Sequence, residues 1–101
     1  MDAHYVEPLR YTGDKEDAHR KLVTLIASQP RARIVAEEAD YLRAEFSSAI
    51  LRFVDDVEFS FSANQPVIDV RSASRVGRYD FGANRRRIEH LRSQWNQGLG
   101  D

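Results

Sequence analysis

Residues 53–76 read F-V-D-D-V-E-F-S-F-S-A-N-Q-P-V-I-D-V-R-S-A-S-R-V, and this stretch decides the fold. Apolar and polar side chains alternate over residues 53–61 and again over residues 67–76, which is the two-residue period of a half-buried strand. The Asn-Gln-Pro sequence between these segments favours a turn. The stretch therefore predicts two antiparallel strands, with Arg71 and Arg75 on the same face of the second strand.

Upstream of these strands the pattern predicts a helix and a hairpin. Apolar residues at helical spacing run through residues 14–28, and Pro30 ends them. The period then changes to two at residues 34–36 and 42–46, and the residues between these segments are polar enough for a turn. We therefore expect a two-stranded hairpin after the first helix.

The two ends of the chain complete the predicted domain. Residues 1–13 are predicted to be an irregular or extended lead-in, because Pro8 biases the residue before it away from helix. A second helix is predicted to begin after Gly82 and to end near Gly98. Residues 1–101 thus form a single predicted α+β domain: an antiparallel four-stranded sheet, with an N-terminal and a C-terminal helix packed on one face.

Composition excludes several classes of function. The chain has no cysteine, which excludes disulfides and thiolate metal sites. Its formal net charge of -1 gives no overall field that favours nucleic acid, so no nucleic-acid partner is expected. No apolar run approaches the ~18 residues of a membrane-spanning helix. His4, His19 and His90 show no ligand spacing, so neither a metal nor a cofactor is expected.

Arginines gather near the end of the chain. There are thirteen arginines and only two lysines, and six of the arginines lie in residues 71–87. Arginines at residues 85–87 would occupy the first turn of the last helix, where the helix dipole disfavours cations. One interpretation is a site for an anion or a carboxylate, built from guanidinium groups and free backbone N–H groups. Its candidate residues are Arg71, Arg75, Arg78, Asn84 and Arg85.

The other interpretation of the arginines is structural. Carboxylates are as numerous as basic groups, and ion pairs between strand and helix are common in folded domains. This interpretation predicts that the arginines lock the last strand to the last helix. The candidate ion-pair partners are Asp55, Asp56 and Asp80.

Asp55 is the one acidic residue that strict alternation places on the apolar face of its strand. A buried carboxylate needs a partner, so Asp55 could anchor an arginine or act as a general acid or base. A bulge that turns Asp55 outward, or a position in solvent at the start of the strand, would remove the conflict. A structural role is favoured over catalysis.

Three segments together resemble a known family. They are residues 53–59 (F-V-D-D-V-E-F), 70–77 (V-R-S-A-S-R-V-G) and 80–87 (D-F-G-A-N-R-R-R), and residues 8–11 and 40–46 fit the same pattern. In these segments the chain is similar to the DUF1499 family of uncharacterised proteins. The resemblance implies a bacterial protein that is exported or anchored at the envelope, or a protein of the thylakoid lumen. It brings no catalytic residues. Many members also have an upstream segment with cysteine and asparagine, which this chain lacks.

Three functions follow from these patterns as expectations. The leading one is a non-enzymatic binding or accessory domain, whose arginine cluster holds a small anion or a protein partner. A second is a small hydrolase, with Asp55 as acid or base and Arg75 as electrostatic stabiliser. A third is a structural interaction module that uses an exposed edge strand or the open sheet face, which predicts a strand-mediated dimer.

Overall fold

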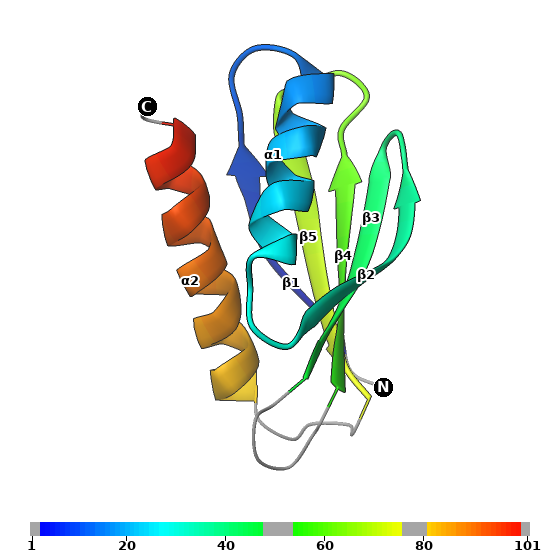
Figure 1. The fold of residues 1–101 in the computed structure, drawn as a ribbon, viewed down its shortest axis with the longest axis vertical. Helices are drawn as coiled ribbons and strands as arrows, with labels where there is room; N and C mark the ends of the chain where they lie inside the picture. Colours follow the sequence, from blue (N-terminus) through cyan, green and yellow to red (C-terminus); the bar gives the residue numbers. More distant parts are fainter. Residues whose placement is uncertain (1–2, 48–53, 76–80, 100–101) are drawn as a thin grey trace.

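The computed structural model describes residues 3–47, 54–75 and 81–99. Two helices lie on the same side of a single sheet, as Figure 1 shows. The predicted single α+β domain with two helices and an antiparallel sheet is confirmed. The elements in chain order are β1 (Ala3–Arg10), α1 (Lys15–Ala27), β2 (Ala32–Glu38), β3 (Tyr41–Ser47), β4 (Val54–Phe61), β5 (Val67–Ser74) and α2 (Phe81–Leu99).

The sheet has five strands, so the prediction of four is wrong. The additional strand is β1, in the segment that was expected to be a lead-in. It pairs antiparallel with β5 at one edge of the sheet, whose strand order is β1-β5-β4-β3-β2. The pairing register shifts between Val6 and Leu9, and Pro8 lies in this interruption. Proline lacks an N–H group and is tolerated at a bulge of an edge strand, which explains why the alternation in β1 was hidden.

The core lies between the helices and one face of the sheet. Alternation along β4 and β5 turns apolar side chains such as Val57, Phe59 and Val70 toward the helices, where they are buried. The helices contribute stripes at the expected spacing. The buried helix residues are Ala18, Leu22 and Ile26 on α1 and Ile88, Leu91 and Trp95 on α2. The opposite sheet face is polar, and we call it the open sheet face.

Both helices begin close to the predicted positions, with one consequential difference. Asp14 is the N-cap of α1, and its backbone carbonyl accepts a hydrogen bond from the Ala18 N–H at 3.1 Å. Helix α2 begins at Phe81 and not after Gly82, so Asn84 lies within the helix. Residues 85–87 consequently lie beyond the first turn. The helix dipole acts mainly within that turn, so the expectation that it disfavours these arginines is not met.

The C-terminal helix binds backbone carbonyls near the end of β1. The Trp95 indole Nε1–H donates a hydrogen bond to the Arg10 carbonyl at 2.8 Å. Arg92 donates from Nη1 to the Pro8 carbonyl at 3.0 Å and from Nη2 to the Glu7 carbonyl. Carbonyls of an edge strand that would otherwise accept from water or from another chain are therefore satisfied by α2.

Candidate functional site

Charged side chains cover the open sheet face. Residues at alternate positions of β2 to β5 point away from the helices, and Arg75, directly after β5, joins them. Cross-strand pairing brings these side chains within reach of one another. The residues that make hydrogen bonds or ion pairs there are Arg33, Tyr41, Arg43, Glu45, Asp56, Glu58, Arg71 and Arg75.

Arg75 joins two carboxylates that face each other across β3 and β4. Glu45 and Asp56 are direct cross-strand partners, a pairing of like charges that is unfavourable by itself. Arg75 donates to Asp56 from Nε and Nη2, both at 2.9 Å, and from Nη2 to Glu45 at 2.5 Å. These bonds raise the pKa of Arg75, with Asp56 as the larger cause. The hydrogen bond from Arg75 is also the main cause of the lowered pKa of Glu45.

A second group on the open sheet face is centred on Glu58. The Tyr41 hydroxyl donates to Glu58 at 2.6 Å, and Arg71 Nη1 donates to its other oxygen at 2.5 Å. These two hydrogen bonds, with that of Tyr41 as the larger cause, lower the pKa of Glu58. Burial, followed by the bond to Glu58, raises the pKa of Tyr41 to about 12. Beside this group lies a hollow of about 350 Å³ lined by Glu58, Ser60, Asp69 and Arg71.

Asp55 lies on the helix side of the sheet. Its exposed fraction is only 8%, so neither the outward bulge nor the solvent position at the strand start is correct. Arg87 of α2 donates to it from Nη1 at 2.6 Å. The Arg87 guanidinium also lies over the Phe46 ring, 5.4 Å from its centroid. Asp55 and Arg87 thus form a strand-to-helix ion pair at the base of α2.

The sheet separates the candidate arginines into two sets. Arg71 and Arg75 lie on the open sheet face with Asp56, whereas Arg87 and Asp55 lie on the helix side. Arg85 is exposed on α2, which covers that helix side. Two of the candidates, Arg78 and Asp80, lie outside the described residues, and of Asn84 only the backbone is described.

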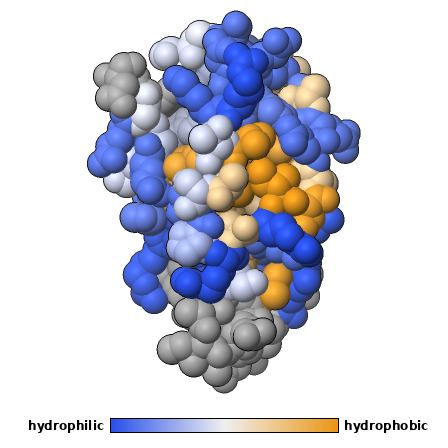
Figure 2. Space-filling model, in the orientation of Figure 1, coloured by the Kyte–Doolittle hydropathy of each residue, from blue (hydrophilic) through white to orange (hydrophobic). Residues whose placement is uncertain are grey.

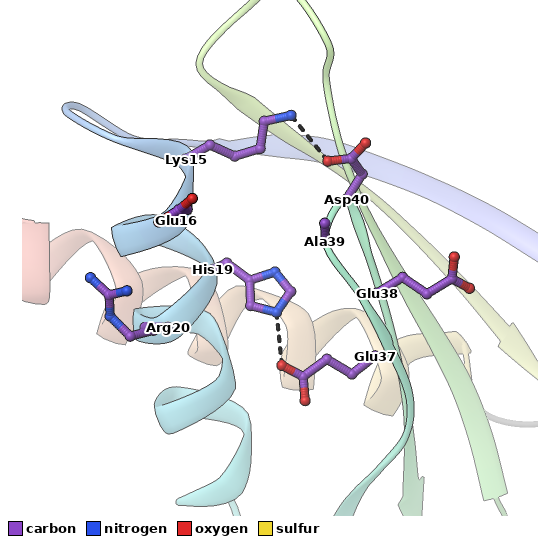
Figure 3. Close-up of a pocket in the computed structure, with 8 residues that line it drawn as sticks. All are labelled: Lys15, Glu16, His19, Arg20, Glu37, Glu38, Ala39 and Asp40. Atoms are coloured by element: carbon purple, nitrogen blue, oxygen red, sulfur yellow. Dashed lines mark hydrogen bonds and ion pairs between the residues drawn. The ribbon is translucent and has the colours of Figure 1, made fainter.

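A separate pocket of about 630 Å³ lies between α1 and the β2–β3 hairpin (Figure 3). His19 extends from α1, and its Nε2 lies 2.9 Å from a Glu37 carboxylate oxygen. Its ring stacks on Phe61 with 5.4 Å between centroids. Lys15 and Asp40 form an ion pair across the same pocket at 3.1 Å. In the part of the chain that the structure describes, no group of three histidine or acidic side chains is arranged to hold a metal ion.

Sequence reasoning did not find this pocket or the full array on the open sheet face. His19 gives no spacing signal, because its partner Glu37 is 18 residues further along the chain. Arg43 and Glu45 did give a signal, since they alternate with buried residues of β3. That alternation was used to predict the strand, and the polar half of the same pattern marks the open sheet face.

Comparisons with known proteins place the chain in a family without assigning it an activity. Among curated proteins and among solved structures, none is significantly similar. In the described ranges, neither helix has the length and apolar composition that a membrane crossing requires. The sequence model of one family, "Protein of unknown function (DUF1499)", matches residues 1–95, nearly the whole chain. The chain therefore belongs to the DUF1499 family.

Proposed function

We propose that this DUF1499 domain is a non-enzymatic binding domain, and that it binds carboxylate or phosphate groups of a partner on the open sheet face. The binding residues are Arg43, Arg71 and Arg75. The observation that supports this most strongly is the geometry of Arg75. Its Nε and Nη2 are fixed by Glu45 and Asp56, while its Nη1 makes no hydrogen bond to any residue in the described ranges.

A guanidinium held in this way is suited to binding. Its side chain is already ordered, so less conformational entropy is lost when a ligand binds. It also remains accessible, because 41% of the Arg75 side chain is exposed, with 42% for Arg71 and 37% for Arg43. Arginine N–H groups bind carboxylates and phosphates through charge-assisted hydrogen bonds.

The neighbouring carboxylates set the affinity and the kind of partner. Glu45, Asp56 and Glu58 neutralise part of the positive charge, so a single small anion is expected to bind with a dissociation constant of about 1 mM or weaker. A partner that presents several acidic groups along the sheet would contact several arginines at once. A protein surface or polymer with repeated carboxylates or phosphates therefore fits better than one small anion.

Support for a hydrolase is weaker. Asp55, the residue expected to act as acid or base, is buried and already accepts a hydrogen bond from Arg87. The action of the domain at the bacterial envelope, or in an analogous compartment, belongs to the same proposal and rests on the family resemblance.

NMR of the arginine side chains tests the proposal. The Nε–H signals would be followed during titration with inorganic phosphate and with a tetraglutamate peptide. Saturating shifts are expected at Arg43 and Arg75, larger for the peptide than for phosphate at equal charge. The variants Arg43→Gln and Arg75→Gln should each reduce the affinity. Arg20→Gln, on the exposed side of α1, is the matched control and should leave it unchanged.

Two results would overturn the proposal. One is the absence of saturating shifts on the open sheet face with either probe. The other is an equal response of Arg20 and Arg75, which would indicate unspecific attraction to any exposed arginine.

A further inference from the structure

The two edges of the sheet differ in how they are protected. The outer edge of β1 is interrupted at Pro8, and donors from α2 bind carbonyls at and next to this interruption. β2 forms the other edge, and no strand in the described part of the chain pairs with its outer side. An unpaired edge strand can add a strand from another chain. This leaves β2 as the edge at which the sheet can be extended.

The middle of β2 is apolar and partly exposed. Ile34, Val35 and Ala36 are each intermediate in burial, although they lie at the sheet edge. On α1, His19 contacts Glu37 of β2, and Val23 is one helical turn further along the same side. Figure 2 shows the largest area of hydrophobic colouring in this view to the right of centre, on the side of α1 toward β2. The edge therefore offers an apolar centre for contact.

Charges of opposite sign flank this centre. Arg31 and Arg33 precede it, while Glu37 and Glu38 follow it. When two copies of such a strand run antiparallel, the basic end of each copy faces the acidic end of the other. The pattern is thus complementary to itself about a two-fold axis, as the interface of a symmetric dimer requires.

We propose that the occupant of this edge is a second copy of the chain, and that two β2 strands pair antiparallel to form a dimer. The two sheets then join into one, with the helices of both copies on the same face. Because each copy uses its own β2 edge in this two-fold contact, the assembly closes at two copies and does not extend into a fibre.

The faces of the sheet restrict the register of this pairing. Arg33 is opposite Glu45 and Glu38 is opposite Tyr41, so both point to the open sheet face. Residues directly opposite in an antiparallel pair share a face. A register in which Arg33 of each copy faces Glu38 of the other meets this condition and forms two equivalent ion pairs. The bulge in β2 between Ile34 and Ala36 interrupts the backbone hydrogen bonds at the centre of the strand. The register therefore depends strongly on the two ion pairs between Arg33 and Glu38.

Reversal of single charges tests the proposal by sedimentation-velocity ultracentrifugation. The unmodified chain is expected to convert from monomer to dimer between about 10 µM and about 1 mM, the range of a modest interface. Arg33→Glu and Glu38→Arg each turn both ion pairs into repulsive contacts. The dimer dissociation constant of each variant alone should therefore rise by about tenfold or more. An equimolar mixture of the two should restore the dimer, because each copy then supplies the charge that the other needs.

The controls separate dimerisation from folding and from general charge effects. Arg33 also contacts Glu45 at 3.2 Å, so circular dichroism must show that each variant remains folded. Lys21→Glu makes the same change in net charge as Arg33→Glu, but on the exposed side of α1, and should leave dimerisation unchanged. A chain that remains monomeric at about 1 mM would overturn the proposal. So would single variants that dimerise as well as the unmodified chain, or a mixture that stays monomeric.

Discussion

The ion pair between Asp55 and Arg87 gives the sharpest test of what holds α2 to the sheet. Replacing Arg87 by methionine keeps an unbranched apolar stem next to Phe46 but removes the guanidinium. Asp55 would then remain as a buried carboxylate without its 2.6 Å partner. Removal of one partner of a buried ion pair costs about 3–5 kcal/mol of unfolding free energy. We expect a loss in the lower half of this range, because both side chains retain some exposure, 23% for Arg87 and 12% for Asp55.

Removal of the acid should cost less than removal of the base. In Asp55→Val the guanidinium of Arg87 keeps its position over Phe46 and can turn toward water at the end of its long side chain. We expect a loss of about 1–2 kcal/mol. The double variant Asp55→Val with Arg87→Met leaves no buried charge, and an apolar replacement of both partners is often close to neutral. Its loss should therefore be smaller than that of Arg87→Met alone.

The unmodified chain, the two single variants and the double variant form a double-mutant cycle. Urea unfolding monitored by the fluorescence of Trp95, the only tryptophan, measures the unfolding free energy of all four proteins. Trp95 is buried on α2 and reports directly on the helix that the ion pair anchors. Two outcomes would refute the reasoning. One is a loss below about 1 kcal/mol for Arg87→Met, the level of an exposed ion pair. The other is a double variant whose loss equals the sum of the two single losses, since coupled neighbours are not additive.

Three further predictions concern other contacts. Trp95→Phe removes the hydrogen bond to the Arg10 carbonyl and should lower the unfolding free energy by about 1–2 kcal/mol in urea unfolding followed by circular dichroism, since this variant has no tryptophan; an unchanged value would show that α2 does not protect this edge. Absorbance at alkaline pH should show a tyrosine that titrates with a pKa of about 12, and this titration should be absent in Tyr41→Phe. The protonated hydroxyl of Tyr41 stabilises the fold, and this stabilisation should be lost as the pH rises from 10 to about 12. The pKa values of Glu45 and Glu58 are lowered in the folded state, so their stabilisation is present above pH 4.5 and is lost as pH falls through the lowered values. In Glu58→Gln the melting temperature should fall less steeply as the pH is lowered below 4.5. A pH dependence of the melting temperature equal to that of the unmodified chain would contradict the lowered pKa of Glu58.

Most of the fold could be predicted from local pattern. Alternation over residues 53–61 and 67–76 indicated β4 and β5, and helical spacing with Pro30 indicated α1. The first strand could not be recognised in the same way, because Pro8 and the register shift interrupt its period. What makes residues 3–10 a strand is their pairing with β5, which is distant in the sequence (from Arg10↔Val67 to Ala3↔Ala73), and this partner leaves no mark on the local sequence.

The candidate site was predictable in composition and not in arrangement. Period two predicts Arg71 and Arg75 on one face, and in the structure both side chains pair with carboxylates of the open sheet face. Asp56 pairs with Arg75, and Asp55 pairs with Arg87. Proximity in sequence suggested one arginine cluster, but the Arg75 side chain lies on the open sheet face, whereas α2 lies on the opposite side of the sheet. The Arg87 side chain therefore contacts Asp55 on the helix side of the sheet. The contribution of Glu45, which meets Arg75 from β3, depends on strand order and could not be read from the sequence.

The contact between α2 and β1 has a consequence for how the chain folds during synthesis. The first strand leaves the ribosome well before its two structural partners, β5 and α2. Until they emerge, β1 can neither pair nor have its carbonyls satisfied by Arg92 and Trp95. Contacts between such distant segments slow folding and leave an exposed strand in the nascent chain. Completion of the sheet thus waits until α2 has been synthesised, and a chain that stops before residue 92 would expose β1 carbonyls that Arg92 and Trp95 otherwise bind.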